Sequence, residues 1–165
     1  PTADGAPGGQ GTERSLVPQP AAHIAREPRD PHLDLPAVVA RIRRSKAAIK
    51  ALLLDQGVVS GIGNIYADET LFLARVHPLR PGSSLSARTV ARIIRTSAEV
   101  MGEAIAAGGT SFDALYVNTA GEAGYFEREL RAYGRGGEEC LRCGRLMERM
   151  VIGGRTSHLC PRCQK

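Results

Sequence analysis

The sequence predicts a mainly helical protein followed by a small, metal-stabilised β-hairpin. Apolar residues recur at helical spacing from Asp34 to Gly108, whereas the chain from Tyr133 onward has short strand-like runs, frequent glycines and all four cysteines. Aromatic residues make up only 4% of the chain and tryptophan is absent, so a core must be built from aliphatic side chains. Residues 1–22 are rich in glycine and proline and have no hydrophobic period, which is typical of a linker, a long loop or a frayed end.

The first two helices are predicted on either side of a bend. One begins at Asp34, which is placed to cap it, has Pro36 in its first turn and continues through Leu54. The bend falls at residues 55–60. A second helix follows over residues 64–74, with two carboxylates in its first turn, where the helix dipole favours them: Asp68 and Glu69.

A third long helix is predicted to begin after Ser86, a good N-cap, and to end at the pair Gly108–Gly109. A short helix is expected at residues 112–116. A polar, glycine-containing loop follows at residues 118–126.

The four cysteines form two Cys-x-x-Cys pairs, Cys140/Cys143 and Cys160/Cys163, with sixteen residues between the pairs. Four converging thiolates make a closed tetrahedral site, so we expect one structural Zn²⁺ that supplies folding energy to a short segment. A dithiol redox pair and disulfides are the alternatives, and two pairs in register argue against both. His158 is a further potential ligand, but the cysteines already fill the coordination shell.

The segment between the cysteine pairs predicts a β-hairpin with Arg155 at its tip. Residues 147–152 and 155–159 read as strands, and Gly153–Gly154 suits a two-residue hairpin turn. Further basic residues surround this arginine in the sequence: Arg142, Arg145, Arg149, Arg162 and Lys165. This surface is interpreted either as a solvated basic face or as a contact for nucleic acid.

The stretch GVVSGIGNIYADET forms a glycine-rich elbow ahead of the second helix. Gly61 and Gly63 permit a close backbone approach to an anion at the positive end of that helix, and Asn64 adds an amide donor. The Gly-Lys-Ser/Thr of a nucleotide-binding loop is absent, so no nucleotide cofactor is expected. Lys46 and Lys50, placed on the preceding helix, could supply positive charge for a phosphodiester. The alternative is that Asn64 only caps its helix.

Charge and hydropathy bound the partners and the compartment. The net charge of +5 and the pI near 9.4 suit a polyanionic partner. No apolar stretch is long enough to span a bilayer, and the chain does not begin like a secretory signal. We therefore expect a cytoplasmic protein with no membrane partner.

Two segments resemble one known family. KALLLDQGVVSGIGNIYADE closely resembles the helix–two-turn–helix segment of the formamidopyrimidine-DNA glycosylase and endonuclease VIII family. GYFERELRAYGR, followed by the Cys-x-x-Cys pairs and GGRTSHLC, resembles the zinc finger of the same family. The match runs from about His23 to Lys165, and the aspartate of GNIYADE favours the formamidopyrimidine branch, which excises oxidised purines such as 8-oxoguanine.

The resemblance implies roles for particular residues. Asn64 matches the asparagine that holds the phosphate beside the lesion, and Lys50 matches a second phosphate-binding lysine. Arg155 matches the zinc-finger arginine that grips phosphates beside the flipped nucleotide and assists strand elimination. With Lys46 and Gly63, these residues form the expected DNA-binding set. Residues 118–124 resemble the mobile loop that closes over the extruded base.

The resemblance also implies three parts. Residues 1–33 would be a linker or the remnant of a missing β-rich domain, residues 34–132 the helix–two-turn–helix domain, and residues 133–165 the zinc finger. The family's nucleophile is a proline followed by a glutamate, whereas Pro1 precedes Thr2 here. We therefore expect the DNA-binding C-terminal half of a bifunctional DNA glycosylase/AP lyase, a monomer that binds damaged duplex DNA without excising. The alternative is a stand-alone, non-catalytic zinc module that binds DNA or RNA.

Overall fold

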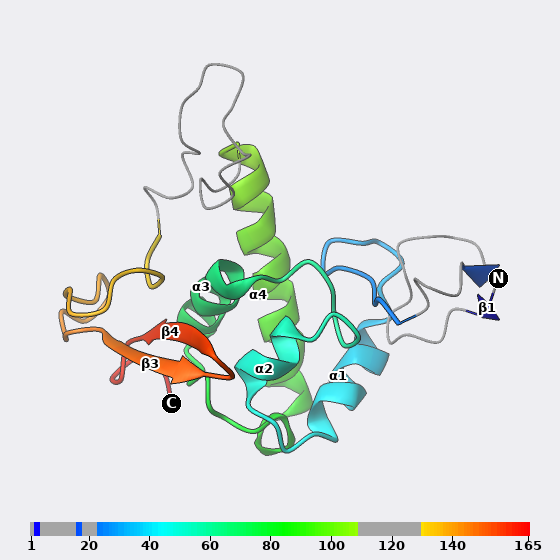
Figure 1. Ribbon diagram of the computed structural model, residues 1–165, viewed down its shortest axis with the longest axis horizontal. Helices are drawn as coiled ribbons and strands as arrows, with labels where there is room; N and C mark the ends of the chain where they lie inside the picture. Colours follow the sequence, from blue (N-terminus) through cyan, green and yellow to red (C-terminus); the bar gives the residue numbers. More distant parts are fainter. Residues whose placement is uncertain (1, 4–15, 18–22, 109–129) are drawn as a thin grey trace.

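The computed structural model describes residues 2–3, 16–17, 23–108 and 130–165. Its elements, in chain order, are β1 (Thr2–Ala3), β2 (Leu16–Val17), α1 (Leu35–Arg43), α2 (Ile49–Leu54), α3 (Asn64–Ala74), the 3-10 turn η2 (Gly82–Ser84), α4 (Ala87–Ala106), β3 (Glu148–Ile152) and β4 (Arg155–Leu159). The helices gather in one body, the β3–β4 hairpin lies beside α3, and the antiparallel pair β1–β2 lies at the opposite end (Figure 1). The predicted mainly helical class with a terminal β-hairpin is confirmed.

The prediction of one helix over residues 34–54 is wrong, because α1 and α2 are separated by residues 44–48. The backbone of this connection bonds to a distant segment instead of continuing the helical ladder. The N–H of Gly82 donates to the carbonyl of Ala47 at 3.0 Å. A Cβ on this glycine would lie 2.3 Å from the carbonyl oxygen of Ile42, so only glycine allows this approach. A tertiary contact therefore overrides the local helical pattern.

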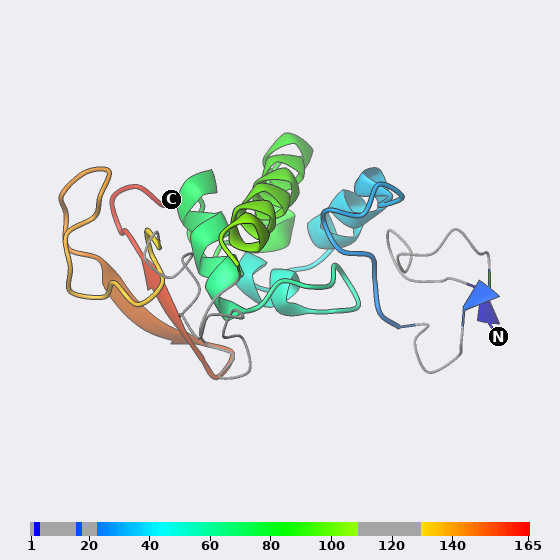
Figure 2. The same cartoon turned by 90° about the horizontal axis from the view of Figure 1, so that it is seen from above.

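The α3 helix lies between the β3–β4 hairpin and α4 (Figure 2), and most of its residues are buried. Leu71 belongs to the aliphatic core that α3 shares with α1, α2 and α4. Its neighbour Phe72 packs instead into a second core with the zinc-finger segment, against Cys140 and Cys160. Because both cores draw on α3, this helix joins the helical part to the hairpin.

The α4 helix follows its sequence pattern closely. The Ser86 Oγ accepts from the Thr89 N–H at 3.1 Å, as a predicted N-cap should, and the helix ends at Ala106, shortly before Gly108 with its φ of +85°. The helix predicted at 112–116 and the loop predicted at 118–126 lie outside the described residues. Among the helices described, none has the length and apolar character needed to cross a bilayer.

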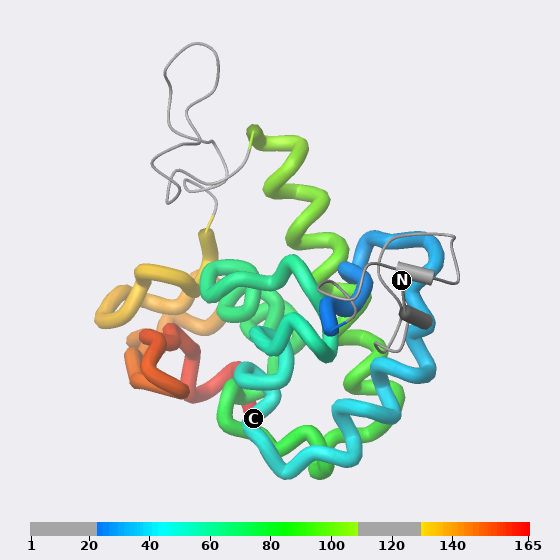
Figure 3. Tube along the Cα trace, turned by 45° about the vertical axis from the view of Figure 1, so that its right-hand side comes forward, coloured from blue at the N-terminus to red at the C-terminus, as the bar shows by residue number. Residues whose placement is uncertain are grey.

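The β3–β4 hairpin forms as predicted, with Ile152 paired to Arg155 across a two-residue turn. Gly153 and Gly154 have φ of +57° and +77°, the conformation that this type of tight turn requires. The chain then returns to the helical part, where the N–H of His77 donates to the Lys165 carbonyl at 2.9 Å (Figure 3). The C-terminal residue that follows the hairpin is thus held against the helical part.

Candidate functional site

The four cysteines converge as the sequence predicts. Their sulfur atoms all lie within 4.8 Å of one another. Sulfurs at about 2.3 Å from a tetrahedral zinc would be about 3.8 Å apart. The Cys143–Cys160 and Cys140–Cys163 sulfur distances are 3.5 and 4.0 Å, so the donor set and its spacing fit one structural Zn²⁺.

The backbone of each cysteine pair orients its thiolates. The N–H of Arg142 donates to the Cys140 sulfur, and the N–H of Cys163 donates to the Cys160 sulfur, each at 3.4 Å. Without a cation, two of these thiols differ in pKa. A hydrogen bond with the Arg145 backbone lowers the pKa of Cys143 to about 7, whereas burial raises the pKa of Cys160 to about 12. A bound zinc ion would offset the cost of holding four clustered thiolates, two of which, Cys140 and Cys160, are buried.

The zinc site is tied to α3 by contacts that the sequence pattern did not indicate. The Gln164 side chain accepts from the Cys160 N–H at 2.8 Å and donates to the Val76 carbonyl at 3.1 Å. The Arg142 guanidinium lies over the Phe72 ring, 4.4 Å from its centroid. The position of the finger is therefore fixed relative to the end of α3.

Lys50 is buried, contrary to the expectation of a lysine that faces phosphate. Its side chain is fully enclosed, and its ammonium donates to Asp68 Oδ1 at 2.7 Å, to Ser157 Oγ at 2.6 Å and to the Thr156 carbonyl at 3.2 Å. These three acceptors use all three N–H groups of the ammonium. Burial lowers the pKa of Lys50, against the hydrogen bond and charge of Asp68, which raise it, while the charge of Arg155 lowers it further.

Asn64 is the first residue of α3, and its side chain does not cap the helix, so the alternative of a mere cap is wrong. The cap is Gly63, in extended backbone with no side-chain bond. Asn64 Nδ2 donates to the Thr156 carbonyl at 2.9 Å, the same oxygen that Lys50 reaches. Its Oδ1 is buried without a hydrogen-bond partner.

Arg155 is exposed at the hairpin tip, next to the carbonyl that Asn64 and Lys50 share. A hollow of about 220 Å³ lies beside it, lined by Ala51, Leu54, Asp55, Ile152, Gly153 and Arg155. Lys46 is exposed, and it lies on the connection between α1 and α2 and not on a helix, where it was predicted. Among the described residues, no hydrogen bond or ion pair joins it to this cluster. The structure thus brings together Lys50, Gly63, Asn64 and Arg155.

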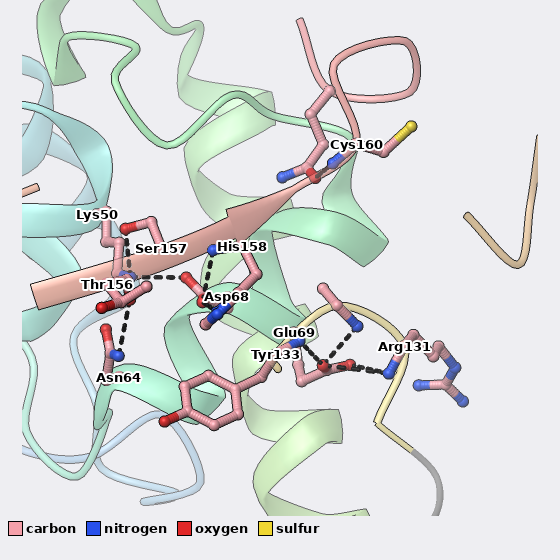
Figure 4. Close-up of polar contacts among 12 residues, drawn as sticks. Lys50, Asn64, Asp68, Glu69, Arg131, Tyr133, Thr156, Ser157, His158 and Cys160 are labelled. Carbon is pink, nitrogen blue, oxygen red and sulfur yellow. Dashed lines mark hydrogen bonds and ion pairs between the residues drawn. The ribbon is translucent and has the colours of Figure 1, made fainter. Parts of the chain in front are cut away.

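Asp68 and Glu69 are buried polar residues whose importance sequence reasoning missed, because it placed them in the first turn of the second predicted helix, where the helix dipole favours carboxylates. They lie in the second turn and are buried. Asp68 Oδ2 accepts from the backbone N–H of His158 at 2.9 Å and lies 3.0 Å from its ring Nδ1 (Figure 4). Glu69 accepts from three consecutive backbone N–H groups, those of residues 131–133. One signal of this burial was available in the sequence, namely the position of both residues among apolar neighbours.

Residues 24–115, more than half of the chain, match the family model described as the formamidopyrimidine-DNA glycosylase H2TH domain. The chain belongs to the formamidopyrimidine-DNA glycosylase family. Residues 137–165 also match a model described as the zinc finger found in FPG and IleRS, which agrees with the four-cysteine site.

Two members of the formamidopyrimidine-DNA glycosylase family show how much of the relatives this chain covers. The Mycolicibacterium paratuberculosis enzyme is 54% identical over 150 residues, which is 91% of this chain and 53% of the relative. The Leifsonia xyli enzyme is 50% identical over all 165 residues and 56% of its own length. The chain therefore spans about half the length of the relatives it matches.

Solved structures of the formamidopyrimidine-DNA glycosylase family share the fold. MutM (Fpg) from Thermus thermophilus has a TM-score of 0.79 at 40% identity, over 86% of this chain and 54% of that one. Lactococcus lactis Fpg, non-covalently bound to DNA that contains an AP site, has a TM-score of 0.77 at 34% identity, over 87% and 51% of the two chains.

Proposed function

We propose that this chain is the DNA-binding portion of a base-excision-repair DNA glycosylase/AP lyase that removes oxidised purines, namely 8-oxoguanine and formamidopyrimidines. By itself it binds damaged duplex DNA as a monomer and does not excise the base. The observation that carries the proposal is the junction at the Thr156 carbonyl, where Asn64 from α3 meets the hairpin beside Arg155.

This junction suits a DNA backbone. Two kinds of hydrogen-bond donor that can bind a phosphate lie on adjoining elements. One is the N-terminus of α3, where Gly63 is exposed, and the other is the exposed side chain of Arg155 on the hairpin. The connection between α2 and α3 contains a turn in which the Val58 N–H donates to the Asp55 carbonyl at 2.9 Å. The two helices and this connection are proposed as the helix–two-turn–helix unit.

Five residues are proposed to serve DNA binding. Gly63 allows close backbone approach, Asn64 and Arg155 donate directly to phosphates, and Lys46 adds an exposed charge. Lys50 contributes its charge from beneath the surface, because its N–H groups are already donated within the protein. Arg155 is also proposed to assist strand elimination in the whole enzyme.

The lesion class and the compartment rest on the relatives and on the cysteines. Structures of relatives hold DNA with a carbocyclic 8-oxo-G, Fapy-dG or an abasic site. Thiolates held by zinc are typical of a reducing compartment, so we propose that the protein acts in the cytoplasm. The proposed lack of excision rests on the share of the relatives that this chain spans, which is about half of their length.

The test is a DNA-binding titration over a range of salt concentrations, with duplexes that carry 8-oxoguanine, an abasic site or no lesion. Asn64→Ala and Arg155→Ala should each weaken binding about tenfold, because a charge-assisted hydrogen bond contributes about 1.5 kcal/mol or more. Arg155→Ala should also reduce the slope of log K against log salt by about one, because it removes a cation that displaces a counterion, whereas Asn64→Ala removes no charge and should leave the slope nearly unchanged. Glu99→Gln, on the exposed face of α4, is the control.

Three outcomes would contradict the proposal. Unchanged affinity and slope in both variants would leave a zinc protein whose basic surface binds no DNA. A covalent adduct at Pro1, trapped with borohydride on abasic DNA, would show that the chain is itself a lyase. Equal affinity for RNA and damaged DNA would favour the stand-alone nucleic-acid-binding module.

A further inference from the structure

We propose that Asp68 is a positioning residue, which sets the hairpin, and with it Arg155, against the Asn64 end of α3. The inference rests on the proposed function, because it concerns how that DNA-binding surface is held. It assigns a role to a buried carboxylate that makes no contact with the solvent-facing surface itself.

Asp68 is placed to fix two elements at once. Its side chain is 1% exposed, and each of its oxygens serves a different partner. Oδ1 pairs with the Lys50 ammonium from α2, and Oδ2 accepts from the backbone N–H of His158 in β4 (Figure 4). A carboxylate with both oxygens occupied in this way sets a fixed distance between α2, α3 and β4.

The same network continues to the tip of the hairpin. Through Lys50, Asp68 acts on Ser157 Oγ and on the Thr156 carbonyl, one residue from Arg155. Asn64 donates to that same carbonyl. Among the described residues, the hydrogen bonds that join α2 and α3 to residues 156–158 all come from three side chains: Lys50, Asn64 and Asp68.

The contact at His158 N–H shows why the carboxylate matters here. In an antiparallel hairpin, alternate N–H groups of a strand point away from its partner and need another acceptor. Asp68 supplies this acceptor for β4, so the strand docks in one register on α3. Removing the charge would leave the buried ammonium of Lys50 without its counterion.

Glu69 offers a matched control on the same helix. It is equally buried, but it bonds to residues 131–133, the segment that leads into the zinc finger, on a different path from the hairpin tip. Loss of either carboxylate should destabilise the fold. Only the loss of Asp68 should release Arg155.

The experiment uses zinc-loaded protein and the variants Asp68→Asn, Glu69→Gln, Arg155→Ala and Asp68→Asn/Arg155→Ala, all measured where circular dichroism and zinc content show them folded. The first readout is amide hydrogen exchange. Asp68→Asn should raise the exchange rate of the His158 amide at least tenfold relative to a reference amide in α4, and Glu69→Gln should not. Equal exchange in the two variants would overturn the inference, whether or not the protein binds DNA.

The second readout is affinity for an abasic-site duplex. Asp68→Asn should weaken binding about fivefold in the wild-type background and less than twofold when Arg155 is already alanine, because it acts through that residue. An equal loss in both backgrounds, or an equal loss in Glu69→Gln, would show a general structural role and overturn the inference. Failure of the wild-type protein itself to bind would count against the proposed function alone, while hydrogen exchange still decides the role of Asp68.

Discussion

At the scale of single residues, Gly63 and Asn64 have different roles at the start of α3. Gly63 is the N-cap, is exposed, and has open space where a Cβ would point. Asn64 turns its amide toward the hairpin. No steric contact therefore requires glycine here, and its place at the N-cap is compatible with the proposed approach of a phosphate to this backbone.

Gly63→Ala tests this division. Because its φ of −92° is open to any residue and nothing lies within 4 Å of the added Cβ, the free energy of unfolding should fall by no more than about 1 kcal/mol, the usual cost of alanine in place of glycine at an N-cap. The affinity for abasic-site DNA should fall severalfold if a phosphate approaches this backbone. Thermal unfolding and a binding titration measure the two quantities.

Gly61→Ala is the comparison for this experiment. Its φ of +81° makes a side chain costly, so this variant should lose stability whether or not DNA is involved. A Gly63→Ala protein that folds and binds like the wild type would remove the steric argument for that glycine.

The positions of Asn64 at the start of a helix and of Arg155 at the tip of a hairpin were predictable because their signals are local: a glycine elbow before a helix and a glycine turn in a hairpin. The burial of Lys50 was not predictable in this way. Its enclosure depends on residues 156 and 157, which lie 106 and 107 positions along the chain. A basic residue in an amphipathic pattern gives no local sign of such a partner.

At the scale of elements, α3 contributes residues to two different hydrophobic cores. Its two buried carboxylates, Asp68 and Glu69, bond to two different segments of the chain. Glu69 accepts the N–H groups of residues 131–133, which lower its pKa, yet burial raises the pKa of Glu69 more strongly, so the net direction is upward from 4.5. The folded state then holds a proton that the unfolded state releases. The unfolding free energy should fall as pH rises from 4.5 through the folded pKa.

Glu69→Gln should remove this dependence. The wild-type unfolding free energy minus that of the variant should be largest at the acid end of the window and decline as pH rises. Near neutral pH the variant should be less stable by about 1–3 kcal/mol, because an amide leaves a buried N–H without its acceptor. Denaturant unfolding at several pH values measures the difference, with Glu99→Gln as the exposed control. A difference that grows with pH would mean that the hydrogen bonds outweigh burial.

Among the described residues, α1 to α4 and the β3–β4 hairpin were predicted with one error, whereas the short pair β1–β2 and the turn η2 were not predicted. Capping by Asp34 and Ser86 and the hairpin turn all follow from local chemistry. The break at residues 44–48 was missed because its cause is the distant backbone around Gly82, and apolar residues continue at helical spacing through it.

At the scale of the whole molecule, the zinc site supports the position of the hairpin as well as its fold. Phe72 of α3 shares a core with two of the ligands, Cys140 and Cys160. A structural zinc contributes on the order of 10 kcal/mol to folding in small fingers. Loss of the ion should therefore expose one side of α3.

Zinc removal tests this coupling. Chelation, or Cys140→Ser, should unfold the region around the hairpin, lower the melting temperature and reduce DNA affinity at least as much as Arg155→Ala. Helical circular dichroism should largely persist, because the aliphatic core of α1–α4 does not include the cysteines. Adding back zinc should restore binding to the chelated protein. Full affinity in the zinc-free state would contradict the proposed role of the hairpin.

The buried Lys50–Asp68 pair also has a consequence for how the chain reaches its folded state. The helices and the hairpin each form from neighbours in sequence, whereas Asp68 meets His158 across 90 positions and Lys50 meets Ser157 across 107. Closing so long a loop costs entropy before any contact compensates for it. Docking should therefore be slower than either local event, and until it occurs both charges keep their water. The last step of folding would then be the desolvation of an ion pair.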